Sequence, residues 1–423
     1  MGAGSVGILA SAFLAKQQDS VVLHEGSKTL GGITRDILDS RGRLFFAGCQ
    51  YLEASILPEE YDYSGLRTFR HRYGSVTETS SESFFKSDFA GPAFRDDWFE
   101  MDHESRFSAR EKVEGESIRD RFRLYPPRIG QELQSYASRL IPLNALEILD
   151  SDSIGTLGLA RVTSWGNDSK LLESKLSNAT ADRIYGVTRQ TLGRPHETAL
   201  VPTLGYNHFW NIFCNQIATR TRLDIRFGTK VNRESALSEI SQGNYTTKIW
   251  TADPRFPTRH FSGKKLESYC YKKYIVGISV DEVCGLDLPY YLNVFSSSNS
   301  ILRIYVYELE SEVRASIELS RPPENLKSLR MEVARALNSS TISLKIRDQG
   351  FTCNELRQYF PHTIFDAALL KFTSEQMKKS GWISEAIEHS DRSSRLQSIL
   401  KVCKVSEISA NVEKISASGE PNP

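Results

Sequence analysis

Apolar and polar positions along the first 70 residues follow the pattern of an α/β unit. Small and apolar side chains recur at helical spacing over residues 7–16 (GILASAFLAK), which predicts a helix. Residues 20–24 (SVVLH) then form a short β-branched run, which is typical of a strand buried in a parallel sheet. We therefore expect a helix followed by a buried parallel strand near the amino end of the chain.

The regular pattern is lost between residues 73 and 120. The run SVTETSSESFFKSDFAGP and the charged residues after it indicate loops and exposed hairpins of an inserted segment. Helix-like periodicity is stronger from 128 to 192, a stretch that includes IGQELQSYASRLIPLNALEIL. These two stretches predict a region that is separate from the α/β unit.

Strand-like patterns return in the second half of the chain, at 222–232, 245–251, 269–281 and 301–319. The last of these, ILRIYVYELESEVRASIEL, alternates strongly, as expected for two antiparallel strands with one solvated face. The order of the blocks predicts an α/β fold class. We expect a nucleotide-binding domain with a parallel sheet and helices, interrupted by a mixed α+β substrate domain.

Composition and charge narrow the classes of partner. The 423 residues are 39% hydrophobic and 25% charged, with a mean hydropathy of −0.37, which is ordinary for a soluble globular protein of two or three domains. Lysine and arginine total 53 against 52 acidic residues, so no overall field favours nucleic acid or an anionic membrane. An anionic ligand must therefore be held by local arginines.

The six cysteines are scattered and include no C-x-x-C pair: Cys49, Cys214, Cys270, Cys284, Cys353 and Cys403. This spacing favours neither a metal site nor a disulfide framework, and it leads us to expect a reducing, cytoplasmic environment. No apolar run reaches the roughly 18–20 residues that a membrane-spanning helix needs. Met1 leads directly into glycines, so we expect no secretory signal.

A glycine motif opens the predicted helix. The sequence Gly2-Ala3-Gly4-Ser5-Val6-Gly7 has G-x-G-x-x-G spacing. In such motifs the first glycine permits a tight turn, the second lets a pyrophosphate approach the backbone, and the third lets helix and strand pack closely. The amides and the positive dipole end of the helix then face the phosphates. The motif indicates a dinucleotide site.

Two later features strengthen this interpretation. Glu25 follows the buried strand, 18 positions after Gly7, where an acidic side chain can bind ribose hydroxyls. The pair Gly31-Gly32 comes six positions later and gives E-x-x-x-x-x-G-G. The alternative is that Glu25 is a solvated charge at a strand end and the glycine pair a plain turn. The three elements in order favour the dinucleotide site.

This order resembles the amino-terminal region of FAD-dependent amine oxidases and their relatives. The resemblance implies a Rossmann-like domain in which FAD is held by Gly2, Gly4, Ser5, Gly7, Glu25, Gly31 and Gly32. Residues 42–50 (GRLFFAGCQ) resemble the segment that runs beneath the flavin ring, which implies a close backbone approach at Gly48 with Gln50 nearby. The alternative for this segment is a buried strand that ends in a turn.

Later segments resemble the UDP-galactopyranose mutases of the same superfamily. Residues 201–207 (VPTLGYN) are similar to their proline-x-x-glycine-tyrosine segment, and NHFWNIFCNQIA follows as a helix-like run. Residues 225–231 (IRFGTKV) resemble the strand whose valine, here Val231, contacts the adenine end of FAD. Residues 249–254 (IWTADP) correspond to a strand that ends in a threonine-glycine-proline type of turn.

The resemblance also implies substrate-binding residues. Arg303, in LRIYVYE, is similar to the arginine that lines the mutase sugar-nucleotide pocket, and a guanidinium suits a diphosphate because its planar fork donates paired hydrogen bonds. The resemblance implies catalytic roles for Arg303 and Tyr206. The alternative for Arg303 is an outward charge on an amphipathic strand. Weaker candidates precede this region, in the part that corresponds to a mobile substrate-covering loop: Trp165, Arg183, Tyr185 and Arg189.

The chain departs from this family at both ends. A buried apolar strand of about five or six residues precedes the first glycine in such folds, whereas only Met1 precedes Gly2 here. We expect a start assigned too far downstream rather than a truncated form. The glycine-rich motif that covers the flavin near the carboxyl end is not evident, apart from a distant echo at 359–361 (YFP).

The resemblance implies a discontinuous architecture. We expect an FAD-binding domain of 1–70, 195–255 and 340–408, a substrate or cap domain of 71–194 and 256–339, and a flexible tail at 409–423.

Three functions follow. The first is a flavoenzyme that resembles UDP-galactopyranose mutase and acts on a nucleotide sugar in glycan biosynthesis; there the cofactor supplies most of the chemistry and the protein positions the sugar and its diphosphate. The second is an oxidoreductase of the amine-oxidase or desaturase kind. The third is a degenerate, non-catalytic flavoprotein. The sequence leaves the oligomeric state open.

Overall fold

The structure is a computed structural model. It describes residues 2–16, 18–48, 51–70, 72–80, 85–99, 116–165, 168–188, 192, 198–228, 240, 242–245, 247–266, 269–285, 287–337, 343–347, 352–360, 363–364, 366–384, 387 and 392–402.

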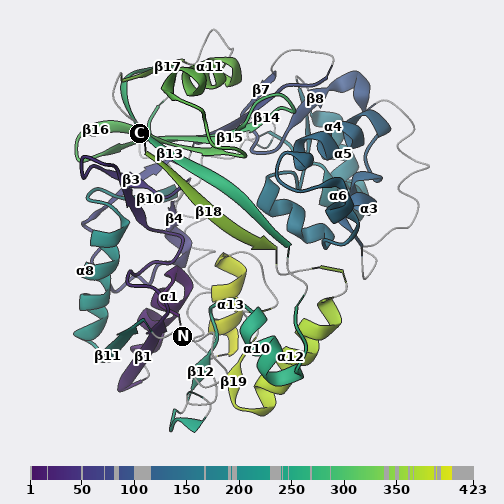
Figure 1. The fold of residues 1–423 in the computed structure, drawn as a ribbon. Coiled ribbons are helices and arrows are strands. Elements are labelled where there is room, and N and C mark those ends of the chain that lie inside the picture. The colour runs from purple at the N-terminus through teal and green to yellow at the C-terminus, as the bar shows by residue number, and fades with distance from the viewer. Residues whose placement is uncertain are drawn as a thin grey trace, which may run out of the picture.

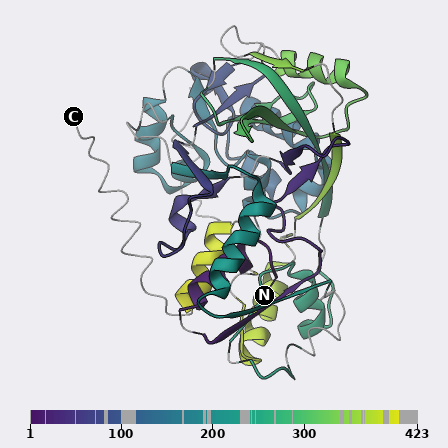
Figure 2. The ribbon, with the colours of Figure 1, turned by 90° about the vertical axis from the view of Figure 1, so that its left-hand side faces the viewer.

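A helix and a parallel pair of strands form the amino-terminal unit (Figure 1). Helix α1 covers Ser5–Leu14 and strand β1 covers Ser20–Glu25, which pairs along its whole length with β11 (Arg222–Phe227). Every residue of α1 is buried, because the helix carries small and apolar side chains on all sides. Helices α8 (Tyr206–Ala218) and α13 (Arg392–Val402) pack against it, as Figure 2 shows.

The largest sheet of the described residues has eight strands. Its order is β17–β13–β16–β15–β14–β6–β7, with β18 also paired to β13. The strands are β6 (Arg72–Thr77), β7 (Phe85–Ser87), β13 (Tyr269–Cys284), β14 (Tyr290–Phe295), β15 (Ile301–Leu309), β16 (Glu312–Leu319), β17 (Ser343–Ile346) and β18 (Thr352–Phe360). Helix α11 (Leu326–Ala336) packs on this sheet through Leu329 and Val333.

Residues 301–319 confirm the predicted pair of antiparallel strands. The expected solvated face is wrong, because the residues on both faces of β15 and β16 are mostly buried. β15 and β16 are joined by Glu310 and Ser311, whose φ angles are 52° and 62°. Two adjacent residues with positive φ make the kind of two-residue turn that matches the twist of a hairpin.

The expectation of exposed hairpins from residue 73 onward is wrong for β6. This strand lies inside the eight-stranded sheet, parallel to β14, and Val76 is buried there. The polar residues of β6 led to the wrong prediction. Ser75 and Thr77 are fully buried, and Thr77 Oγ1 accepts a hydrogen bond from the Ala93 amide. The sequence does not distinguish a buried threonine whose hydroxyl is hydrogen-bonded to the backbone from a threonine at the surface.

Most of the helices between residues 116 and 188 form a separate layer beside one end of the sheet (Figure 1). They are α3 (Ile118–Phe122), α4 (Pro127–Ser138), η3 (Leu143–Glu147), η4 (Ser151–Leu157), α5 (Ser169–Ser177) and α6 (Ala179–Ile184). The short strands β8 (Ala93–Arg95) and β9 (Thr163–Trp165) pair beside them, and η2 (Asp96–Trp98) follows β8. This layer has its own apolar core, which also includes Tyr271 and Phe295 of the sheet.

A smaller group of elements lies near the amino-terminal unit. Strand β12 (Lys248–Ile249) pairs in parallel with β19 (Trp382–Ile383), and helices α10 (Arg255–Ser262) and α12 (Ala367–Lys379) pack beside them. Trp250 and Met377 belong to the core of this group.

The remaining strands connect these parts. β2 (Asp36–Leu38) and β3 (Leu44–Phe46) form a hairpin. β4 (Leu52–Glu53), β10 (Thr198–Pro202) and β5 (Leu66–Arg70) form a small sheet with β10 in the middle, and η1 (Ala54–Ile56) follows β4. Within the described ranges, none of the helices has both the length and the apolar character that crossing a bilayer would take.

The predicted fold class is confirmed. The chain has a mixed α/β fold, with parallel strand pairs and helices at the amino-terminal unit and a large mixed sheet next to a helical layer. The residue boundaries of the two predicted domains stay a prediction, and the predicted tail at 409–423 lies outside the described residues.

Candidate cofactor-binding site

The turn before α1 is closed by glycine packing. A Cβ atom built at Gly7 would lie only 1.7 Å from the Gly2 carbonyl oxygen, so the first turn of the helix packs directly on the incoming backbone. Gly4 is the N-cap residue and α1 begins at Ser5, with no side chain capping the helix. The first amides of a helix lack partners within the helix itself. The turn therefore presents donor groups and a positive dipole end to whatever lies in front of it.

Glu25 is tied to this turn. One carboxylate oxygen accepts a 2.9 Å hydrogen bond from the Ala3 amide, and the other accepts a 2.8 Å bond from the Ser27 amide. β1 ends at Glu25, so the strand delivers the carboxylate to the side of the glycine turn. A carboxylate can accept about four hydrogen bonds, which leaves acceptor capacity for ribose hydroxyls.

Gly31 and Gly32 also lie against the glycine turn. The Gly31 amide donates a 2.8 Å hydrogen bond to the Ala3 carbonyl, and Gly4 and Gly31 form a parallel bridge. Both glycines have positive φ, 86° at Gly31 and 64° at Gly32, a region that favours glycine. A Cβ at Gly31 would lie 2.4 Å from the indole of Trp210, so a larger residue does not fit.

Trp210 fixes the position of this loop. Its indole nitrogen donates a 2.9 Å hydrogen bond to the Thr34 carbonyl, and the Thr34 hydroxyl donates to the Gly31 carbonyl. Trp210 is fully buried in α8, so this helix holds the loop of Gly31 and Gly32 in place. No sequence pattern predicts this role, because Trp210 occupies an ordinary apolar position of a helix.

Thr251 and Arg395 contact the glycine turn and its neighbouring loop, and the sequence did not predict this role. The Gly2 amide donates a 3.0 Å hydrogen bond to Thr251 Oγ1, and Arg395 of α13 donates to the Thr251 and Ala252 carbonyls. The only sequence signal was the position of Thr251, directly after a predicted strand. The guanidinium brings a positive charge to the loop that contacts the glycine turn.

The residues present fit a dinucleotide diphosphate. Among the described residues, the one atom within 4 Å of a Cβ built at Gly4 is the Gly32 Cα, at 4.0 Å, so these residues leave the space over Gly4 open. Gly4 and Gly32 thus leave room where side chains would otherwise stand, in front of helix amides with no acidic residue in the first turn of α1. A backbone cradle of this kind suits an anion that must approach closely.

The segment predicted beneath a flavin ring is a buried strand. Phe46, at the end of β3, is fully buried and stacks on Tyr307 with ring centres 4.2 Å apart. Its amide donates to the Tyr307 hydroxyl, while its carbonyl accepts from the Ser316 hydroxyl. The strand ends in a turn at Gly48, where φ is 114°, and Gln50 lies outside the described residues. The close approach predicted at Gly48 stays a prediction.

Tyr206 lies in the core at the start of α8. Its side chain is fully buried and meets the Phe46 ring edge-on, with centres 4.9 Å apart. The Asp36 carboxylate accepts hydrogen bonds from the Tyr206 and Asn207 amides at 3.0 and 2.8 Å, and so stabilises the helix start. Gly205, with φ of 91°, lets the chain pass within contact of Asp36. A catalytic role for Tyr206 stays a prediction.

Arg303 belongs to a buried group of charges on the large sheet. Its guanidinium lies 3.5 Å from the Glu318 carboxylate, and the same Glu318 oxygen lies 3.1 Å from Lys273 Nζ. The side chains of Lys273 and Glu318 are 3% and 5% exposed, and that of Arg303 is 19% exposed. Arg303 also donates to the Thr156 carbonyl of η4, so it connects the sheet with the helical layer. Lys273 and Arg303 thus share one carboxylate oxygen of Glu318.

The alternative of an outward, solvated Arg303 does not describe this geometry. The guanidinium also lies over the Tyr291 ring, 6.0 Å from its centre. A cation beside an aromatic face and a shared carboxylate can bind an anion that approaches from its open side.

Comparison with solved structures identifies proteins of the same fold. No protein-family model and no curated protein matches the sequence. Among solved structures, reduced UDP-galactopyranose mutase is similar over 96% of this chain and 93% of that one, at 13% sequence identity and a TM-score of 0.59. The chain shares the fold of this mutase. Wild-type putrescine oxidase bound to putrescine (95% and 97% covered, 12% identity, TM-score 0.47) and an oxidoreductase from Methanosarcina mazei (85% and 86%, 13%, 0.43) are also similar.

The remaining candidates are dispersed. Tyr185 is fully buried in the core of the helical layer, and Arg183 forms an ion pair with Glu116. Trp165 is about half exposed at the end of β9. Val231 and Arg189 lie outside the described residues, so their predicted contacts stay predictions.

Proposed function

We propose that this protein is an FAD-dependent flavoenzyme that acts on a nucleotide sugar. The observation that carries the proposal is the meeting of three segments at the start of α1: the glycine turn, Glu25 and the Gly31-Gly32 pair. Each of these segments has a separate role in a dinucleotide site, and hydrogen bonds of 2.8–2.9 Å hold them together.

The glycine turn would hold the pyrophosphate of FAD. The amides at the head of α1 face the space in front of Gly4 and Gly32, and Ser5 stands at the first position of the helix. Glu25 would accept hydrogen bonds from the ribose next to the pyrophosphate while it keeps its bonds to the turn. Arg395, through the Thr251 loop, adds positive charge beside the diphosphate.

Bound FAD would supply the chemistry of its isoalloxazine ring, whether group transfer or hydride transfer. The chain's own contribution is to position the substrate. Arg303, with Lys273 beside it, supports recognition of the substrate diphosphate, since both side chains are cationic and the guanidinium is 19% exposed. The mutase fold adds support for a sugar nucleotide as the substrate.

The absorption spectrum of the purified full chain, before and after addition of FAD, tests the cofactor. A flavin band between about 350 and 500 nm that stays with the protein through gel filtration is the expected result. Dithionite-reduced protein is then mixed with UDP-galactose and, separately, oxidised protein with putrescine. A change in the flavin absorption spectrum when UDP-galactose is added under anaerobic conditions supports the proposal.

The other outcomes decide between the alternatives. Bleaching of the oxidised flavin by the amine, with consumption of oxygen, would assign the protein to the amine-oxidase kind of oxidoreductase. A chain that binds FAD but responds to neither compound would overturn the sugar-nucleotide proposal. A folded chain that retains no flavin would overturn the cofactor assignment itself and favour a non-catalytic role.

A further inference from the structure

Lys273 is a buried cation on the far side of β16 from Arg303. Its strand, β13, pairs with β16, and β16 pairs with β15, so the three strands lie side by side in the large sheet (Figure 1). Arg303 lies directly across from Glu318 in the register of β15 and β16. On β13 the residue across from Glu318 is Ile275, two positions after Lys273. Lys273 therefore reaches Glu318 from a diagonal position, and Arg303 reaches it from the opposite strand.

The two cations contact the same oxygen atom of Glu318 at unequal distances. Lys273 Nζ lies 3.1 Å from Oε2, whereas Arg303 Nη1 lies 3.5 Å from it. Hydrogen bonds between a charged nitrogen and a carboxylate are typically about 2.7–2.9 Å long. The contact of Arg303 with Glu318 is therefore the weaker of the two, and the carboxylate is held mainly by Lys273.

Arg303 has further contacts away from Glu318. Its Nη2 atom donates a 3.1 Å hydrogen bond to the Thr156 carbonyl, and its guanidinium lies over the Tyr291 ring. An arginine directly across from a carboxylate on paired strands can instead form a bidentate pair, in which two N–H groups meet both oxygens. Such a pair would occupy the donors that a diphosphate needs.

The three charged side chains differ in what a ligand can reach. The side chain of Lys273 is 3% exposed, and its Nζ atom lies 5.6 Å from the centre of the Tyr271 ring. The side chain of Glu318 is 5% exposed, and that of Arg303 is 19% exposed. Arg303 is therefore the member of the group that a dissolved anion can touch, and Lys273 acts on a ligand through its neighbours.

We propose that Lys273 is a positioning residue, which keeps Arg303 available to an anionic ligand by holding the carboxylate of Glu318. This inference rests on the proposed function, in which Arg303 binds the diphosphate of a nucleotide sugar. Without the lysine, Glu318 would no longer share its charge between two cations and would draw the guanidinium into a bidentate pair. The internal carboxylate and the phosphate oxygens of the ligand would then compete for the same donors.

A double-mutant cycle on the full chain tests this role. The dissociation constant of UDP is measured by isothermal titration for the original chain, Lys273→Met, Glu318→Gln and the double variant. Methionine has about the length of lysine and carries no charge. We expect Lys273→Met to weaken UDP binding by about tenfold in the original chain. In the Glu318→Gln background the same substitution is expected to change the affinity by less than about twofold, because the competing carboxylate is gone.

The cycle separates positioning from direct attraction. A lysine that attracted the anion through its own charge would give the same loss in both backgrounds, and that result would overturn the proposal. Unchanged affinity in Lys273→Met would overturn it as well. Lys273→Arg keeps a cation beside Glu318 and should restore most of the affinity. Lys272→Met is the matched control, since Lys272 is the next residue of β13, its side chain is 50% exposed, and it pairs with Glu355.

Failure of this inference is distinguishable from failure of the proposed function. No UDP binding by the original chain, or binding that Arg303→Ala leaves unchanged, would overturn the placement of the substrate and this inference with it. Binding that depends on Arg303 but gives equal losses in the two backgrounds overturns this inference alone. Should Lys273→Met not fold, Glu318→Gln alone decides. It is expected to bind UDP at least as tightly as the original chain, and weaker binding contradicts the proposal.

Discussion

The Ala3 amide donates a hydrogen bond of 2.9 Å to the Glu25 carboxylate, and this contact joins the glycine turn to the end of β1. The two residues are 22 positions apart in the sequence. Their contact brings an acceptor for ribose hydroxyls next to donors for a pyrophosphate. The candidate site therefore depends on a bond that also stabilises the fold.

Replacement of Glu25 tests this double role. We expect Glu25→Ala to weaken FAD binding by about 10- to 100-fold, because hydrogen bonds to a charged group are each worth roughly 1.5–3 kcal/mol. Glu25→Gln keeps acceptor capacity and should lose less. Isothermal titration of the apoprotein with FAD gives the measurement, and Glu59→Gln, at an exposed carboxylate, serves as the control. Equal affinities for all three variants would remove Glu25 from the site.

The glycine at position 31 is expected to tolerate no side chain. Gly31→Ala places a Cβ 2.4 Å from the Trp210 indole at a φ of 86°, so we expect a loss of about 2–4 kcal/mol in the free energy of unfolding. Gly42→Ala is the matched control, since φ there is 77° and no atom of the described residues lies within 4 Å of the new Cβ. It should cost only the backbone term of about 1 kcal/mol. Urea unfolding of both variants measures the difference, and equal losses would contradict the packing argument.

The buried charges around Arg303 give a separate prediction for stability. Glu318→Gln leaves Lys273 and Arg303 without their shared carboxylate, and we expect a loss of about 3–5 kcal/mol in the free energy of unfolding, since an uncompensated charge stays buried. An exposed pair supplies the control. Arg226→Ala breaks the contact with Asp224, where both side chains are nearly half exposed, and should cost no more than about 1 kcal/mol. A similar small loss for Glu318→Gln would indicate that water reaches the group.

Nucleotide binding separates the role of Arg303 from its structural contacts. We expect Arg303→Ala to weaken the binding of UDP by at least tenfold, because the guanidinium supplies the paired donors that a diphosphate needs. Arg303→Lys keeps the charge without the fork and should recover only part of the affinity. Fluorescence titration with UDP measures both variants. Unchanged affinity in Arg303→Ala would place the substrate pocket elsewhere.

Cys214 is expected to be unreactive in the folded protein and to contribute to alkaline unfolding. Burial in α8 raises the pKa of its thiol to about 12. In the unfolded chain the thiol titrates near its ordinary pKa of about 8.5, so the unfolded state loses its proton first as the pH rises. The raised pKa therefore contributes stability that is fully present below about pH 8.5 and is lost as the pH approaches 12.

Two measurements check this prediction. Alkylation at pH 8 followed by mass spectrometry should modify the exposed Cys270 and Cys284 at once and leave Cys214 unmodified until the chain unfolds. Urea unfolding between pH 8 and 10.5 should show a smaller loss of stability in Cys214→Ala than in the original chain. Rapid native alkylation of Cys214 would contradict the burial.

The local features of this protein could be predicted from its amino-acid sequence. The glycine spacing predicted the turn before α1, the run SVVLH predicted β1, and the alternation over 301–319 predicted the hairpin of β15 and β16. These signals are local, because a φ angle, a helical period or a strand alternation depends on residues close together in the chain. For the same reason Glu25 could be placed at the end of a strand without any structure.

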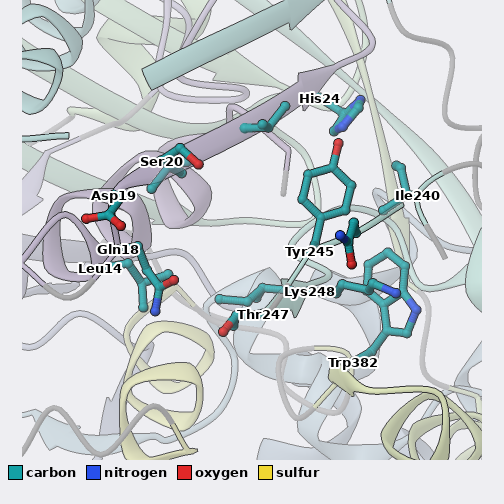
Figure 3. A pocket seen from close by; sticks show the side chains of 14 residues that line it. Leu14, Gln18, Asp19, Ser20, His24, Ile240, Tyr245, Thr247, Lys248 and Trp382 are labelled. Carbon is teal, nitrogen blue, oxygen red and sulfur yellow. The ribbon is translucent and has the colours of Figure 1, made fainter. Parts of the chain in front are cut away.

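Contacts between residues far apart in the sequence became known from the folded chain alone. Thr251 contacts Gly2 across 249 positions, and Glu318 pairs with Lys273 and Arg303 across neighbouring strands. The polar sequence of β6 also predicted an exposed segment, although Ser75 and Thr77 are buried. Such contacts depend on how elements pack and pair across the whole chain, and no window of sequence contains both partners. A cavity of about 270 Å³ beside β1 and β12 is a further example, since segments far apart in the sequence line it (Figure 3).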